Sequence, residues 1–227
     1  MVVAKLSLLP KGVSYEIISC VSKEKQFAKI EKWLRKCGIL SNEEGLESYE
    51  DVTQWSRKGA ESYVSEAQII TTDGKKVHFI VKAIVGILPI NARINELIER
   101  RKLLQSFGIS IPKLFGINSG AMIEAFIPND LLSQKGELPF KTKLQVARIA
   151  SILDFAGFSV LNFLSDLRCS EDLFEVFYVD FGFDLGRPEP QAQSNALQQI
   201  EDQFSLDTAY PQMLEVYHCK KKEAGDR

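Results

Sequence analysis

The chain has few of the side chains on which most hydrolytic and metal sites depend. Its 227 residues include 2 histidines and 4 cysteines. With so little histidine, a Ser-His-Asp or Cys-His nucleophilic site has almost no material, and a histidine-rich metal site has none. The cysteines are scattered and form no Cys-x-x-Cys pair, so the sequence predicts neither a zinc site nor a disulfide framework. Four free thiols fit a reducing compartment.

An excess of positive charge and a long apolar run are also missing. The formal net charge is −2, which argues against nucleic acid as the main partner, because binding phosphates needs Lys and Arg in excess. The longest apolar stretch, HFIVKAIVGILPI, is interrupted by Lys82 and is too short to span a membrane. The first residues have too short an apolar core for a secretory signal. We therefore expect a cytoplasmic protein with no membrane and no nucleic-acid partner.

The first half of the chain alternates between helix and strand patterns. Residues 22–37 carry apolar side chains at helical spacing, and the polar, acidic residues 41–51 predict a loop. Two β-type runs flank Asp73-Gly74, which is a strong signal for an antiparallel hairpin. A helix is expected over residues 91–107. The segments ISIPKLFGI and AMIEAFIP then predict two further short strands.

The second half is mainly helical. Thr142 and Gln145 have the spacing of a capping box at the start of a helix that is apolar on nearly every face and ends at Gly157. The run LFEVFYV then predicts a strand, and residues 190–217 predict further helix. In the stretch FYVDFGFDLG, Asp180 stands at the end of this strand and is followed at once by Phe-Gly, where the backbone turns easily.

This order of elements, with Lys82 in FIVKAIV and Asp180 in VDFG, resembles the protein-kinase-like fold. The resemblance covers about residues 52–186 and is closest to the small-molecule branch typified by aminoglycoside and choline phosphotransferases. It implies a two-lobed α+β fold with bound ATP and Mg²⁺. The implied parts are a helical extension over residues 1–51, an antiparallel-sheet lobe over 52–127 and a short, mainly helical lobe over 128–227.

Lys82 is the first candidate site residue. Strand alternation places it among apolar side chains, where an ammonium group is costly unless an anion meets it. The resemblance implies that Lys82 joins ATP phosphates to a helix carboxylate. Glu96 and Glu99 are both candidates for that carboxylate, and Glu96 fits the family spacing better. The alternative is an edge-strand lysine that extends into water.

The resemblance implies further nucleotide contacts. Asp180 would hold Mg²⁺ against the phosphates, because that ion prefers hard oxygen ligands. The segment MIEAFIPND is similar to the link between the lobes, which adds Glu124 to the nucleotide-binding set. The phosphate-covering loop offers only Gly59, where protein kinases carry several glycines, and Ser56, Ser62 or backbone N–H groups are the other donors there.

The catalytic loop departs from the family pattern. Counting back from Asp180 places Asn162 at the position of the catalytic Asp and Leu167 at that of the metal-binding Asn. An amide cannot accept the proton, and a leucine cannot bind Mg²⁺. Asp166 is the alternative base or metal ligand if the loop has another register. Otherwise Asn162 only positions a substrate, or transfer has been lost.

Three functions follow in order of preference. The first is an atypical ATP-dependent phosphotransferase acting on an unknown hydroxyl acceptor. The second is a pseudokinase, which would bind nucleotide or a protein partner without phosphotransfer. The third is an unrelated α+β interaction domain in which Asp-Phe-Gly is a coincidence.

Overall fold

The computed structural model describes most of the chain, namely residues 23–51, 56–57, 62–84, 90–118, 121–180, 185–186 and 195–225. It contains helices and an antiparallel sheet, so the predicted α+β class is confirmed. The chain divides into two compact units. Unit 1 holds Met1–Glu96 and Lys113–Phe126, and unit 2 holds Leu97–Pro112 and Ile127–Arg227.

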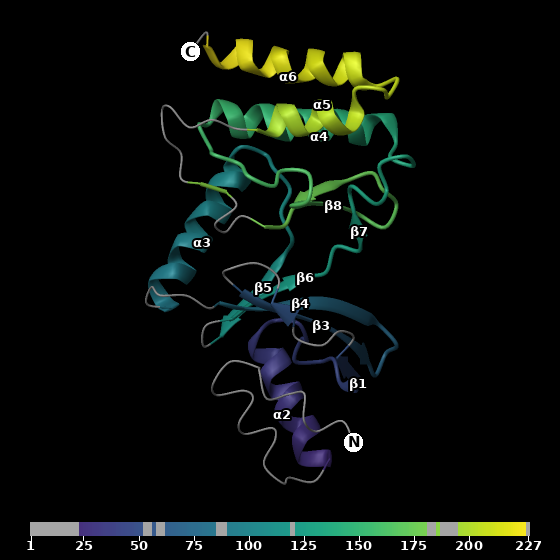
Figure 1. The fold of residues 1–227 in the computed structure, drawn as a ribbon. Coiled ribbons are helices and arrows are strands. Elements are labelled where there is room, and N and C mark those ends of the chain that lie inside the picture. Colours follow the sequence, from purple (N-terminus) through teal and green to yellow (C-terminus); the bar gives the residue numbers. More distant parts are fainter. Residues whose placement is uncertain are drawn as a thin grey trace. The chain divides into compact units, whose positions relative to one another are not determined.

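Unit 1 is built on one antiparallel sheet with the strand order β1-β3-β4-β6-β5, and the short β2 pairs with β3 (Figure 1). The strands are Leu46–Asp51 for β1, Ser56–Arg57 for β2, Ser62–Thr71 for β3, Lys76–Ile84 for β4, Leu114–Asn118 for β5 and Ala121–Ala125 for β6. The predicted hairpin is confirmed. It turns at Asp73-Gly74, where Gly74 has a φ of +81°, a value that favours glycine.

The loop predicted over residues 41–51 is wrong in its second half. Residues 46–51 form β1, which pairs antiparallel with β3 at the edge of the sheet. Its sequence, LESYED, is mostly polar. Among its described side chains, Leu46 is buried and Ser48 and Tyr49 are half-buried. An edge strand with so few core contacts gives too weak an apolar pattern to be recognised in the sequence.

Helix α2, Lys23–Lys36, packs on one face of this sheet (Figure 1). The helix and the loop after it contribute Leu34, Cys37, Ile39 and Leu40 to the core of unit 1. The sheet contributes Ala67, Ile69, Phe79, Val81 and Ile123. The described part of the predicted extension therefore belongs to the core of unit 1. Burial raises the pKa of the Cys37 thiol to about 11, which keeps it protonated and unreactive.

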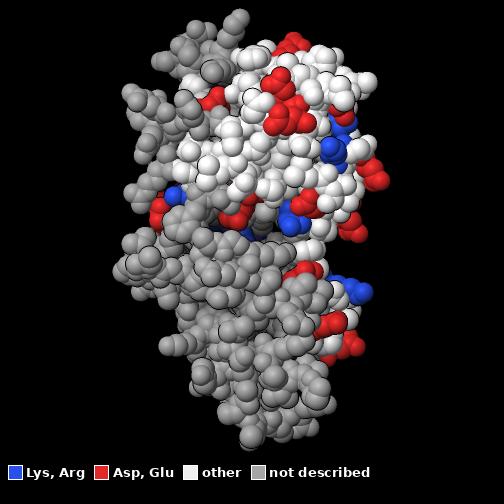
Figure 2. Space-filling view, viewed as in Figure 1, with Lys and Arg blue, Asp and Glu red and all other residues white. Residues whose placement is uncertain are grey.

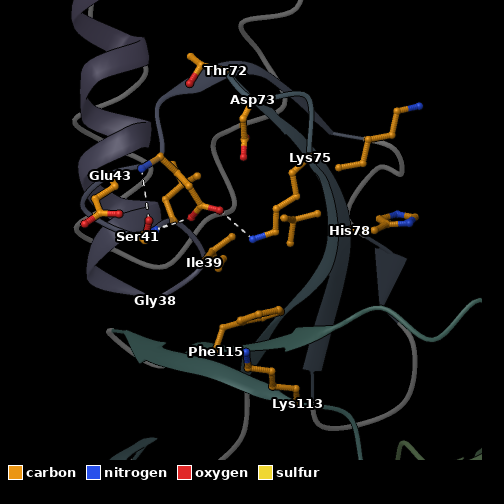
Figure 3. Close-up of a pocket in the computed structure, with 14 residues that line it drawn as sticks. Gly38, Ile39, Ser41, Glu43, Thr72, Asp73, Lys75, His78, Lys113 and Phe115 are labelled. Carbon is orange, nitrogen blue, oxygen red and sulfur yellow. Dashed lines mark hydrogen bonds and ion pairs between the residues drawn. The ribbon is translucent and has the colours of Figure 1, made fainter.

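An ion clamp ties the loop after α2 to the β3–β4 hairpin. Lys75 Nζ lies 2.8 Å from Glu44 Oε1, and the backbone N–H of Ser41 donates to Glu44 Oε2 at 2.7 Å (Figure 3). From the other side, Arg35 donates to the main-chain oxygens of Ser41 and Glu44. The bond from Lys75, helped by the Ser41 N–H, lowers the pKa of Glu44 to about 2.

Unit 2 combines a short antiparallel sheet with helices. Its strands are β7, Asn129–Asp130, β8, Leu167–Cys169, and β9, Val176–Tyr178, in the order β7-β8-β9. The helices are α4, Phe140–Phe155, α5, Ala196–Phe204, and α6, Tyr210–Gly225, which lie side by side in Figure 1. Helix α3, Ile90–Ser106, matches its prediction closely and has its C-terminal part in this unit. No helix in the described ranges has the length and apolar character needed to cross a membrane.

The predicted capping box of α4 is not formed. The helix begins at Phe140 after Pro139, with no side-chain cap. Thr142 is instead fully buried and donates to the carbonyl of Leu173 at 2.7 Å. Gln145 donates to the carbonyl of Phe174 at 2.8 Å and accepts from the N–H of Val176 at 3.3 Å. Both side chains therefore fix the segment that leads into β9.

Glu44→Gln tests the ion clamp. The folded protein holds the Glu44 pKa near 2, below the ordinary value of 4.5, so the ionised form stabilises the fold. That contribution is complete above about pH 4.5 and is lost as the pH falls toward 2. We expect wild type to melt slightly above the variant at pH 7, with the gap closing as the pH falls through this range. Melting curves measured by circular dichroism would show it.

Glu47→Gln, which removes an exposed carboxylate from β1, is the matched control for the loss of one surface charge. A gap between wild type and Glu44→Gln that stays constant or widens down to pH 3 would contradict the assignment. It would mean that the carboxylate of Glu44 gains nothing from Lys75 in the folded state.

Candidate functional site

Lys82 lies on β4, an inner strand of the unit 1 sheet between β3 and β6. Its Nζ is 2.9 Å from Glu124 Oε2, at ion-pair distance but outside the angles of a good hydrogen bond. The Lys82 side chain is 20% exposed and that of Glu124 only 2%. The alternative of an edge-strand lysine is therefore wrong, since Lys82 lies within the sheet beside a buried anion.

Strand register explains why these two side chains meet. Lys82 is opposite Met122 and Ile80 is opposite Glu124, so Lys82 and Glu124 are diagonal neighbours on one face of adjacent strands. This face is opposite to the one that packs on α2, because Phe79 and Val81 belong to that core. The sequence contained a signal: Glu124 is the single charge of β6, and Lys82 lies between apolar residues of β4. The sequence alone does not show that β4 pairs with β6, so it could not indicate that Lys82 and Glu124 are neighbours.

The two helix carboxylates that were proposed as partners of Lys82 differ in their surroundings. Glu99 is exposed and forms an i,i+3 ion pair with Lys102 at 2.8 Å, as an ordinary surface charge does. Glu96 is half-buried on α3. The structure therefore disfavours Glu99 and adds Glu124 as a carboxylate beside Lys82, a pairing that sequence reasoning had missed.

Asp180 follows β9 by two residues, and its side chain is exposed. The strand that carries it is fixed on both sides. The N–H of Tyr178 donates to Ser110 O, and that of Val179 to Asp166 O, each at 2.9 Å. The exposed carboxylate at a fixed strand end is a geometry suited to a ligand. Residues 181–184, including the Phe-Gly of the motif, lie outside the described residues, as does Gly59 of the predicted phosphate loop.

The catalytic-loop candidates differ in exposure. Asn162 is exposed, and its carbonyl accepts from Asp166 N and Ser165 Oγ, each at 3.0 Å. Asp166 is 5% exposed, and Tyr178 Oη donates to its Oδ2 at 3.3 Å. Leu167 is fully buried in β8. A ligand can therefore reach Asn162 far more easily than Asp166, and the position predicted for a metal-binding Asn is part of the core.

The β8–β9 hairpin brings two of the predicted carboxylates to one end of the unit 2 sheet. Because Leu167 is opposite Tyr178, Asp166 is opposite Val179, the residue before Asp180. The described residues contain no group of three or more His, Cys, Asp or Glu side chains placed to hold a metal ion. If Mg²⁺ binds here, phosphate oxygens and water must complete the ligand set begun by Asp180.

Unit 1 also contains a cavity of about 910 Å³, which is not lined by Lys82 or Glu124. Figure 3 shows its walls: the loop after α2 with Ser41, the hairpin turn with Asp73 and Lys75, and the start of β5 with Phe115. None of the predicted nucleotide-binding residues that the structure describes lines it. Its Lys75–Glu44 pair already joins two of its walls. The cavity is therefore separate from the predicted site.

Charge on the drawn surface follows no single sign. Figure 2 shows Lys and Arg scattered among Asp and Glu over the described residues.

In comparisons with known proteins, the sequence matches no family model and no curated protein. Inferences about function therefore depend on the geometry described above.

A double-mutant cycle on Lys82→Met and Glu124→Leu tests the buried pair. Lys82→Met alone leaves a buried carboxylate without its lysine, which should cost up to about 3 kcal/mol in the free energy of unfolding. The double variant should recover part of that loss, giving a coupling energy of roughly 1 kcal/mol or more. Urea unfolding of the four proteins measures it.

The exposed pair Lys102 and Glu99 is the matched control, changed to Met and Leu in the same way. Its coupling should stay within about 0.5 kcal/mol, as for other exposed helix pairs. Equal coupling in the two cycles would show that Lys82 and Glu124 do not interact as a buried pair.

Proposed function

We propose that this protein is an atypical ATP-dependent phosphotransferase with a kinase-like fold. The observation that carries the proposal is Lys82, a lysine within an antiparallel sheet, held beside a buried carboxylate and followed along the chain by a helix. Protein kinases bind ATP phosphates with a lysine on the third strand of their sheet that pairs with a carboxylate of the following helix, whereas the carboxylate shown beside Lys82 comes from strand β6. Lys82 lies on the third long strand, after β1 and β3.

Several features of unit 2 support the same proposal. Asp180 is exposed at the end of a fixed strand, which suits a ligand of the metal that accompanies ATP. The strand follows a buried helix, α4, in the order that the family resemblance implies. Two compact units, one sheet-rich and one mainly helical, are also what a two-lobed kinase-like chain requires.

Each residue has a distinct role in the proposed reaction. Lys82 binds phosphate oxygens, and Asp180 holds Mg²⁺, which neutralises charge on the transferring phosphoryl group. Asn162 is exposed where the base is expected, but its amide can only orient the acceptor hydroxyl by a hydrogen bond. The reaction would then depend on positioning and electrostatics, which carry most of phosphoryl transfer. We expect slow turnover.

A second candidate function is a pseudokinase that binds nucleotide without transfer. It is favoured by the surroundings of Asp166. That carboxylate is buried under the hydroxyl of Tyr178, so it is poorly placed to replace the missing base. Both candidates require nucleotide binding, and they differ only in turnover.

Thermal unfolding with and without ATP and Mg²⁺ tests the shared step. ATP at about a hundred times its dissociation constant should add roughly 2.7 kcal/mol, which raises the melting temperature by several degrees for a chain of this size. Asp180→Ala should remove the Mg²⁺-dependent part of this rise. Glu171→Ala, which changes an exposed carboxylate in the β8–β9 loop, is the control. No rise with any nucleotide at millimolar concentration would contradict both candidates.

Asn162→Asp separates the two candidates. The new carboxylate can accept a proton at nearly unchanged volume, and general-base assistance is worth about 10² to 10⁴ in rate. Release of labelled phosphate from ATP should therefore rise by at least tenfold over a slow wild type. A pseudokinase would show no release in either protein.

Asp166→Asn and Tyr178→Phe complete this assay. Because Asp166 is buried, we expect both variants to keep wild-type turnover under conditions in which they are folded, even where they lower the stability. Loss of turnover in a well-folded Asp166→Asn protein would identify Asp166 as the base after all. Fast wild-type release that Asn162→Asp does not change would show that Asn162 does not stand at the base position.

A further inference from the structure

The cavity of about 910 Å³ is bounded by three segments of unit 1 that contact one another. The loop after α2 meets β5 closely, because a Cβ at Gly116 would lie 3.1 Å from the carbonyl oxygen of Cys37. The same loop meets the β3–β4 turn, where the N–H of Thr72 donates to the carbonyl of Gly45 at 2.9 Å. Ligand sites in proteins commonly have volumes of about 300–1,000 Å³. The cavity therefore has fixed walls and the size of a small-molecule site.

The charged side chains that line the cavity balance one another. Three are cationic and three are anionic, so the formal charge of the lining is zero with His78 neutral. They are Lys75, Lys76, Lys113, Glu43, Glu44 and Asp73. Such a lining gives no net attraction for a polyanion such as a nucleotide, or for a polycation. The lining instead suits a ligand that carries both signs of charge.

Lys113 supplies the positive charge at the β5 wall of the cavity. Its Nζ lies 5.2 Å from the centre of the Phe115 ring, a cation–π contact that holds the ammonium group beside an apolar surface. Within the described ranges, no carboxylate forms an ion pair with Lys113. This ammonium group is therefore available for an anionic group of a ligand.

Asp73 supplies negative charge at the opposite wall, in the turn between β3 and β4. In Figure 3 its side chain points from the turn toward the middle of the cavity, with Ile39 and Phe115 between it and Lys113. The hydroxyl of Thr71 donates to Oδ1 of Asp73, and a carboxylate can accept further bonds at its second oxygen. The cavity thus has a carboxylate at one end, an ammonium group at the other and apolar side chains between them.

We propose that this cavity binds a short peptide with free termini and apolar side chains. The ammonium terminus of the peptide binds Asp73, its carboxylate terminus binds Lys113, and its side chains contact Ile39 and Phe115. The volume is near the upper end of the usual range, which favours a peptide of two or three residues over a single amino acid. This site is independent of the proposed phosphotransfer, because none of the described nucleotide-binding residues lines the cavity.

Isothermal titration calorimetry of the full chain with the tripeptide Leu-Leu-Leu tests the proposal. Wild type should bind the peptide with free termini. Acetylation of the peptide amine and amidation of its carboxylate should each weaken binding about three- to tenfold, because each removes one charge that the cavity meets. No binding of the free peptide at millimolar concentration would overturn the proposal, as would equal affinity for the free and the blocked peptides.

Two variants assign the ends of the peptide. Lys113→Met should bind the free and the amidated peptide equally, and it should keep the loss on acetylation. Asp73→Asn should bind the free and the acetylated peptide equally, while its Asn-Gly turn keeps the hairpin. Lys141→Met and Glu47→Gln, which remove exposed charges outside the cavity, are the controls and should respond to both blocked peptides as wild type does. Variants that respond as wild type does would overturn the assignment of both ends.

Nuclear magnetic resonance locates the bound peptide. Titration of wild type with Leu-Leu-Leu should shift the backbone amide signals of Ile39, Val77 and Phe115, which line the cavity. In Lys113→Met the same signals should shift at a three- to tenfold higher peptide concentration. Shifts confined to residues outside the cavity would show that the peptide binds elsewhere and would overturn the proposal.

Discussion

The contact on which the candidate site depends is the ion pair between Lys82 and Glu124. A lysine in an inner strand needs a nearby anion, because an ammonium group loses its hydration there. Glu124 supplies that anion from the neighbouring strand and is itself almost inaccessible to solvent. A buried pair of this kind adds little net stability compared with apolar residues of similar size. This fits the proposed function, in which Lys82 supplies a positioned ammonium group.

In unit 2 the corresponding constraint is the position of β9. Thr142 and Gln145, which the sequence predicted to cap a helix, instead donate hydrogen bonds to the loop that leads into β9. Tyr178 and Val179 are then bonded to main-chain oxygens on either side. A buried helix, a loop and a strand are thus fixed together up to Asp180. The result is a rigid support for one exposed carboxylate.

The sequence predicted those parts of the fold that have strong local signals. The Asp73-Gly74 hairpin, the helix over 90–106 and the apolar helix α4 follow from turn chemistry and periodicity. What it missed depends on contacts between distant segments. The polar edge strand β1 is specified by pairing with β3, and the partner of Lys82 by pairing of β4 with β6. Such register has no signature in a single strand.

In the proposed function, binding and turnover depend on different residues. Lys82 and Asp180 are the groups that bind phosphate and metal in the proposal, and each is held by neighbours that the structure shows. The residue at the position of the proton acceptor is Asn162, an amide with an exposed side chain. A missing base lowers the rate by about 10² to 10⁴ but has little effect on ground-state affinity. Selection for ligand binding alone would preserve the first pair of residues and leave position 162 free to change, whereas selection for fast transfer would restore a carboxylate there.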